Sequence, residues 1–95
     1  MNLKEFEKEY QMTYSEYQNN IYSKMFKIKP IERIYNFLDS RIGVRINLLV
    51  VDDKYRPTLS IDNVNIYCGE ECKREEARKI VIEKALNYLE YEVSV

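Results

Sequence analysis

Two cysteines, Cys68 and Cys72, are the residues of this sequence best suited to metal or redox chemistry, and they lie four positions apart. A zinc site needs about four ligands, and with no histidine in the sequence carboxylates would have to supply the rest. A disulfide is not expected between thiols of a cytoplasmic protein. We therefore expect two ordinary thiols near a strand end and a helix start, with no metal and no cofactor.

Adjacent carboxylates, at Asp52-Asp53 and Glu70-Glu71, are the candidates for acid–base catalysis. Neighbouring side chains diverge on a strand or a helix, so neither pair would converge on one substrate. The sequence also lacks histidine, the commonest general base, and a phosphate-cradling glycine loop. These features predict a protein that is not an enzyme and that has no catalytic residue.

Basic side chains gather in the window 70–79, but four glutamates in the same window neutralise them. The whole chain has 15 Lys and Arg against 16 Asp and Glu, a net charge of −1. Nucleic-acid-binding domains are usually strongly basic, because much of their affinity comes from neutralising phosphates. The bulk charge thus argues against nucleic-acid binding, and only a local cluster could support it.

The composition indicates one ordered domain of 95 residues, with 45% hydrophobic and 33% charged residues. No apolar run approaches the roughly 20 residues that span a bilayer. The first residues alternate charged with apolar side chains, unlike a signal peptide. We expect a cytoplasmic protein that does not contact a membrane.

The segment 1–29 predicts one long amphipathic helix over 3–27. Neither glycine nor proline interrupts it, and apolar residues recur at steps of three and four: Phe6, Tyr10, Tyr14, Tyr17, Ile21 and Met25. Two interpretations are open. The stripe packs against the rest of the chain, or it forms a dimer seam or partner surface, because tyrosine is favoured at interfaces. The second interpretation would use Tyr10, Tyr14, Tyr17 and Ile21.

The segment 30–95 predicts a second unit of order α-β-β-β-α. A helix begins at Pro30 and is ended by Gly43, and a final helix begins at Cys72. Alternating residues between them predict a three-stranded antiparallel meander with strands 44–51, 58–61 and 64–68 and turns at 52–57 and 62–63. The last part of the first strand is expected to be covered on both faces. The fold class is α+β, α-α-β-β-β-α, with the sheet packed against two helices and the long N-terminal helix added.

This order of elements resembles the double-stranded RNA-binding domain (dsRBD). The run Ala77-Arg78-Lys79-Ile80-Val81-Ile82-Glu83-Lys84-Ala85-Leu86 is similar to the Ala-Lys-x-x-Ala-Ala-x-x-Ala-Leu pattern of that family. Pro30-Ile31, Arg56-Pro57-Thr58-Leu59 and Gly69 resemble its first helix, its second strand and the glycine before its last helix. The resemblance covers about two-thirds of the chain.

The resemblance implies that duplex RNA would be read by shape, through two helices and the first hairpin loop. The family's phosphate-binding positions fall on Arg74, Glu75 and Arg78, of which the middle one has the opposite charge. Its groove-reading glutamate falls on Asn36, and its Gly-Pro-x-His loop is replaced by Asp52-Asp53-Lys54-Tyr55-Arg56.

Two functions follow as hypotheses. The first is a non-enzymatic protein-interaction module on a dsRBD-like scaffold, which binds a protein or self-associates through the N-terminal helix. Its small size and Asn-, Lys-, Ile- and Tyr-rich composition suit an accessory or inhibitor protein of a phage or mobile element that acts on a nucleoprotein. The alternative is a weak or modified binder of double-stranded RNA or DNA. It would use Asn36, Lys54, Arg56, Lys73, Arg74, Arg78 and Lys79.

Overall fold

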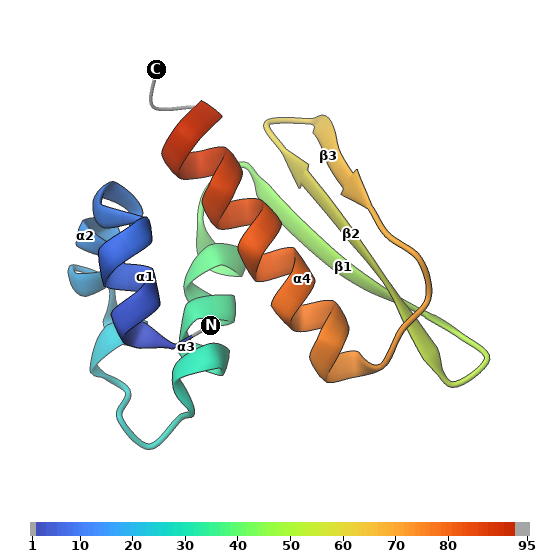
Figure 1. Ribbon diagram of the computed structural model, residues 1–95, viewed down its shortest axis with the longest axis horizontal. Coiled ribbons are helices and arrows are strands. Elements are labelled where there is room, and N and C mark those ends of the chain that lie inside the picture. Colours follow the sequence, from blue (N-terminus) through green and yellow to red (C-terminus); the bar gives the residue numbers. More distant parts are fainter. Residues whose placement is uncertain (1, 93–95) are drawn as a thin grey trace.

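The computed structural model describes residues 2–92 and shows an α+β fold, in which α4 lies diagonally across one face of a three-stranded antiparallel sheet (Figure 1). None of the described helices is long and apolar enough to cross a membrane. The elements of this part of the chain are α1 (Leu3–Glu9), α2 (Gln11–Gln18), η1 (Ile21–Lys24), α3 (Pro30–Ser40), β1 (Val44–Val51), β2 (Lys54–Ile61), β3 (Val64–Cys68), α4 (Arg74–Asn87) and η2 (Tyr88–Glu92).

The sheet has the predicted antiparallel order β1-β2-β3, and two tight turns connect its strands. All four turn residues have positive φ: Asp52, Asp53, Asp62 and Asn63. Two-residue turns of this kind match the right-handed twist of paired strands. The second turn confirms the prediction at 62–63.

The predicted turn over 52–57 is wrong, because β2 already begins at Lys54. Asp52 and Asp53 suffice to reverse the chain, and Val51 pairs directly with Lys54. Pro57 lies inside β2 and is buried, instead of ending a turn. Its missing N–H removes no hydrogen bond to β1, because Leu48 and Pro57 form a non-hydrogen-bonded pair of the ladder. Its carbonyl accepts a hydrogen bond from the N–H of Gly69, beyond the end of β3.

The final part of β1 is exposed, which corrects the expectation that both of its faces are covered. Val44 and Ile46 are buried, whereas Leu49 is 51% and Val50 is 67% exposed. The β1–β2 hairpin extends past the beginning of α4, so no helix covers its tip (Figure 1). The core therefore lies at the other end of the sheet.

The buried side of α4 fills the space between the sheet and the remaining helices. Its apolar residues recur at helical spacing and are almost fully buried: Ala77, Val81, Ile82, Ala85, Leu86 and, in η2, Leu89. All of them except Ala77 belong to one core cluster with Leu59 of β2 and with Ile34 and Leu38 of α3. This confirms the expectation that two helices pack against the sheet. The first of them ends at Ser40, with Arg41 as its C-cap, rather than at Gly43.

The N-terminal segment forms two α-helices and a 3-10 turn, so the prediction of one helix over 3–27 is wrong. The first break is at Tyr10, whose φ of −133° and ψ of 60° are not helical. The second follows Gln18, and the Asn20 side chain there accepts a hydrogen bond from the Tyr22 N–H and caps η1.

The breaks divide the segment into short helices. A straight helix of 25 residues would be about 37 Å long, whereas α1 and α2 have 7 and 8 residues. The breaks fold the stripe back, so that Phe6, Tyr10 and Tyr17 are all buried.

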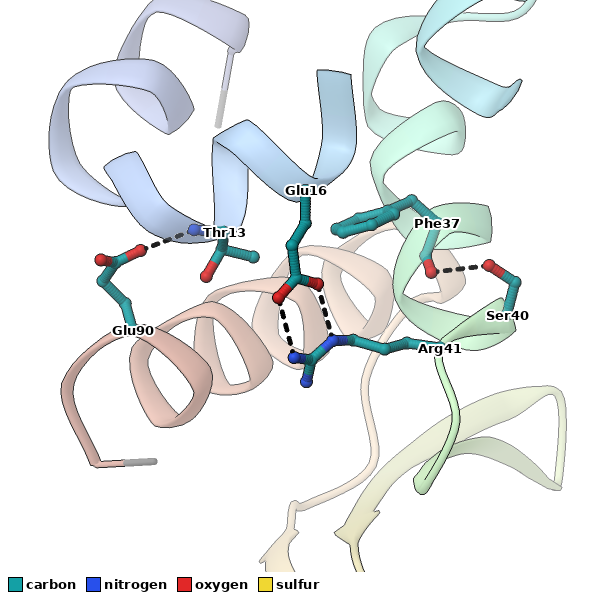
Figure 2. A network of polar contacts seen from close by, with 6 residues as sticks. All are labelled: Thr13, Glu16, Phe37, Ser40, Arg41 and Glu90. Atoms are coloured by element: carbon teal, nitrogen blue, oxygen red, sulfur yellow. Dashed lines mark hydrogen bonds and ion pairs between the residues drawn. The ribbon is translucent and has the colours of Figure 1, made fainter. Parts of the chain in front are cut away.

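Glu90 of η2 stabilises the first break. Its carboxylate accepts hydrogen bonds from the backbone N–H groups of Met12 (3.3 Å) and Thr13 (2.9 Å), in the first turn of α2. Figure 2 shows this side chain reaching the start of α2, and also the two hydrogen bonds that Arg41, after α3, donates to Glu16 (2.9 and 3.0 Å). Glu90 thus serves in place of an N-cap, because Tyr10 makes no side-chain cap.

We expect Glu90→Ala to lower the free energy of unfolding by about 1 kcal/mol, as the loss of an N-cap does. Urea denaturation followed by circular dichroism measures this change. Glu83→Ala is the matched control, because it removes an exposed carboxylate from the solvent side of α4. Equal stabilities of the two variants would show that the Glu90 contacts do not hold α2.

Candidate functional site

The beginning of α4 carries three exposed basic residues, Lys73, Arg74 and Lys79, of which Lys73 is the N-cap. The fourth predicted phosphate ligand, Arg78, turns inward. Its Nη1 atom lies 3.4 Å from Oε1 of Glu32, and its guanidinium lies over the ring of Tyr35 at 5.4 Å. Arg78 therefore joins α4 to α3, and its charge is already balanced within the chain.

Asn36, the residue of α3 that was predicted to contact nucleic acid, lies next to Tyr35. Asn36 is half-buried. Burial raises the pKa of Tyr35, Asp39 raises it further, and the charges of Arg78 and Arg74 lower it. The α3 and α4 candidates are thus brought to adjacent helices, but Arg78 is engaged by α3 rather than facing a ligand.

The β1–β2 hairpin holds the other two predicted residues, Lys54 and Arg56. Arg56 pairs with Glu71 at 3.5 Å. Lys54 lines an open cleft of about 670 Å³ between the hairpin and the start of α4, together with Lys73. Four carboxylates line the same cleft: Asp53, Glu70, Glu71 and Glu76. An acidic cleft of this composition repels phosphate.

Both cysteines also line this cleft, and both are free thiols. Burial, assisted by Glu76, raises the pKa of the Cys72 thiol, so at neutral pH it is protonated and weakly nucleophilic. Within residues 2–92 no group of three or more potential ligands could hold a metal ion.

The tyrosine stripe packs largely inside the chain. Tyr17 is 2% exposed and lies among the rings of Phe6 (5.3 Å) and Phe37 (5.5 Å). Tyr10 is 5% exposed, and its hydroxyl donates a hydrogen bond to Oδ1 of Asn87 at 3.1 Å. These contacts support the interpretation that the stripe packs against the rest of the chain.

Tyr14 and Ile21, the other two predicted interface residues of the stripe, differ in how much of their surface is exposed. Tyr14 is half-buried and packs edge-on against Phe6 at 5.1 Å, whereas Ile21 is 70% exposed. Of the four residues predicted as an interface, Ile21 therefore offers the most accessible surface.

We expect removal of the Tyr17 hydroxyl and removal of the Tyr10 hydroxyl to have different effects on stability. The Tyr17 hydroxyl is buried and has no hydrogen-bond partner among residues 2–92, so Tyr17→Phe should leave stability unchanged or raise it. Tyr10→Phe should lower it by about 1 kcal/mol, because Asn87 loses its donor. Urea denaturation at neutral pH gives both values, and a loss for Tyr17→Phe as large as that for Tyr10→Phe would contradict the assignment.

The same two substitutions test how the free energy of unfolding depends on pH. Burial raises the pKa of both phenols, so the folded state holds these protons more tightly than the unfolded state. The corresponding stability is present below pH about 10 and is lost as the pH rises through the folded pKa. Tyr17→Phe should make this alkaline loss less steep.

An exposed apolar and basic surface follows α2, and Ile21 is its one residue that the sequence patterns predicted as part of an interface. It consists of Ile21, Lys24, Met25, Phe26 and Lys27, and we call it the apolar–basic surface. Phe26 is 80% exposed, Ile21 70% and Met25 39%. A shallow hollow of about 410 Å³ lies between residues 24 and 28.

Arg33 of α3 holds this surface in place. Its guanidinium lies over the Phe26 ring at 5.6 Å, and its Nη1 atom donates a hydrogen bond to the Ser23 carbonyl at 3.2 Å. Arg33 is only 6% exposed, and its Nε atom has no hydrogen-bond partner in the part of the chain that the structure describes. The sequence did carry a signal for this surface, because residues 17–31 contain three lysines and no acidic residue.

Comparisons of the chain with protein-family models, with curated proteins and with solved structures find no match.

Proposed function

We propose that this protein is a non-enzymatic protein-interaction module, built on a dsRBD-like scaffold, whose apolar–basic surface binds an acidic segment of a partner protein. The exposure of Phe26 is the observation that carries the proposal. A large aromatic side chain left 80% accessible is unfavourable in water, and aromatic residues are enriched at the centre of protein interfaces.

The charge around Phe26 selects the chemistry of the partner. Lys24 and Lys27 are exposed on either side of Met25 and Phe26, and Lys29 follows closely. No carboxylate lies between Glu16 and Glu32 to neutralise them. A partner segment that combines Asp or Glu with one or two large apolar residues would bury Phe26 and meet these ammonium groups.

Internal ion pairs support protein binding over nucleic-acid binding. Arg56 is paired with Glu71 and Arg78 with Glu32. The cleft that Glu71 lines holds four carboxylates. Phosphate affinity depends on the number of free cations that a surface presents. The lysines of the apolar–basic surface, by contrast, have no acidic neighbour within their own segment.

A display library of random peptides, selected for binding to the full chain, tests this function. Selection should enrich peptides that carry several Asp or Glu residues with Leu, Phe or Trp. Their affinity, measured by fluorescence anisotropy, should fall at least about tenfold in Phe26→Ser, the loss expected for an interface anchor. It should also fall in Lys27→Glu and as salt rises.

Ile42→Ser is the matched control, because Ile42 is an apolar residue that is 97% exposed and belongs to the α3–β1 connection. This variant should bind the selected peptides like the original chain. If the library yields no acidic peptides, or if Phe26→Ser and Ile42→Ser bind them equally, the apolar–basic surface is not the docking site.

Duplex RNA binding is the second candidate function. It is favoured by Lys73, Arg74 and Lys79, which are exposed and have no ion pair among the described residues. Lys29 lines two hollows together with Lys79, which extends this basic group toward α3.

A titration with an RNA duplex longer than the about 16 base pairs that a dsRBD contacts tests this candidate. Binding should weaken steeply as salt rises, and the double variant Arg74→Glu and Lys79→Glu should abolish it. Arg45→Glu makes a charge reversal on β1, away from both helices, and should have little effect. No change in anisotropy at low salt would exclude the candidate.

A further inference from the structure

β1 is an edge strand whose outer side is open. Because Val51 and Lys54 flank a two-residue turn, they form a hydrogen-bonded pair, and such pairs alternate along the hairpin. The N–H and C=O groups of Ile46, Leu48 and Val50 therefore point away from β2. Among residues 2–92, no backbone hydrogen bond from outside the sheet reaches these three residues.

This edge lacks the features that normally prevent two sheets from joining. β1 runs for eight residues, pairs with β2 without a bulge and contains no proline. Its only charged residue is Arg45, and 46–51 reads Ile-Asn-Leu-Leu-Val-Val. The opposite edge, β3, has five residues and an irregular register. Exposed edges are usually short, charged or bulged, because otherwise they pair with another strand.

The pattern of β1 is self-complementary, which identifies a second copy of this chain as the occupant. An antiparallel pair centred on Leu48 sets Ile46 opposite Val50 of the second copy, and all three outward residues then exchange backbone hydrogen bonds. Their side chains form one continuous apolar row. In the same register Arg45 lies opposite Val51 of the second copy, beside the acidic Asp52–Asp53 turn, so the ends of the pair attract each other.

The shape of the molecule fits this arrangement as well. Figure 1 shows that α4 leaves the β1–β2 hairpin end uncovered. Antiparallel pairing of two β1 strands sets this end of each copy beside the opposite end of β1 in the second copy. Val50, now 67% exposed, becomes covered in the pair. An interface on the apolar–basic surface would leave β1 open, so this inference is independent of the proposed function.

We propose that two copies of the chain associate through antiparallel pairing of their β1 strands, centred on Leu48, to form a continuous six-stranded sheet. Light scattering and sedimentation over a dilution series of the full chain should show a monomer–dimer equilibrium. In amide exchange measured by NMR, the N–H groups of Leu48 and Val50 should exchange rapidly at low concentration and become protected at high concentration. Those of Asn47 and Leu49, which pair with β2, should be protected throughout.

Val50→Lys should weaken the dimer by about tenfold or more, because two ammonium groups would enter the apolar row. Val64→Lys is the matched control: Val64 is a valine on the opposite edge strand, is 55% exposed, and should leave the dimer intact. Because both side chains are already exposed, neither variant should unfold, which circular dichroism checks. A chain that stays monomeric at high concentration, or a dimer that both variants weaken equally, would overturn the proposal.

Discussion

The burial of the aromatic side chains of α1 and α2 is the interaction on which the N-terminal part of this protein depends. Phe6 and Tyr17 are almost inaccessible to water and contact each other, and Tyr17 also contacts Phe37 of α3. Burying them stabilises the fold by several kcal/mol, on the order of 2 kcal/mol for each large side chain. That gain outweighs the hydrogen bonds lost where the helix breaks, and Glu90 restores two of them.

Two arginines also hold the helices and their neighbouring segments together. Arg78 and Arg33 both lie in or near the α3–α4 layer, where each stacks on an aromatic ring and bonds to an oxygen of the chain. They cover apolar surface with their stems and hold neighbouring segments together. An arginine that makes such internal contacts stabilises the fold, and its guanidinium is less available to a ligand. Exposed apolar groups remain uncovered around Phe26 and along β1, and these are the surfaces for which we propose binding.

Much of the fold was predictable from local patterns. Strands 44–51 and 64–68, the turn at 62–63 and the helix that begins at Pro30 all agree with the structure. Each depends on contacts between residues near in sequence, or on one residue's backbone preference, such as left-handed Asp62 and Asn63. The α+β order and the sheet topology followed from them, because short connections force neighbouring strands to be antiparallel.

What the sequence could not determine depended on residues far apart in the chain. The periodicity of 3–27 is compatible with one long helix or with two short ones, and the contact that supports the break joins Thr13 to Glu90, 77 residues away in the sequence. The sequence named the basic residues of 54–79 as candidate ligands of phosphate, but only the tertiary structure paired Arg56 with Glu71 and Arg78 with Glu32. Sequence by itself determined which residues prefer helix, strand or turn, because those preferences are local. Which side chains are covered, paired or left open was decided by tertiary structure, because burial and Coulomb energy depend on distances in space.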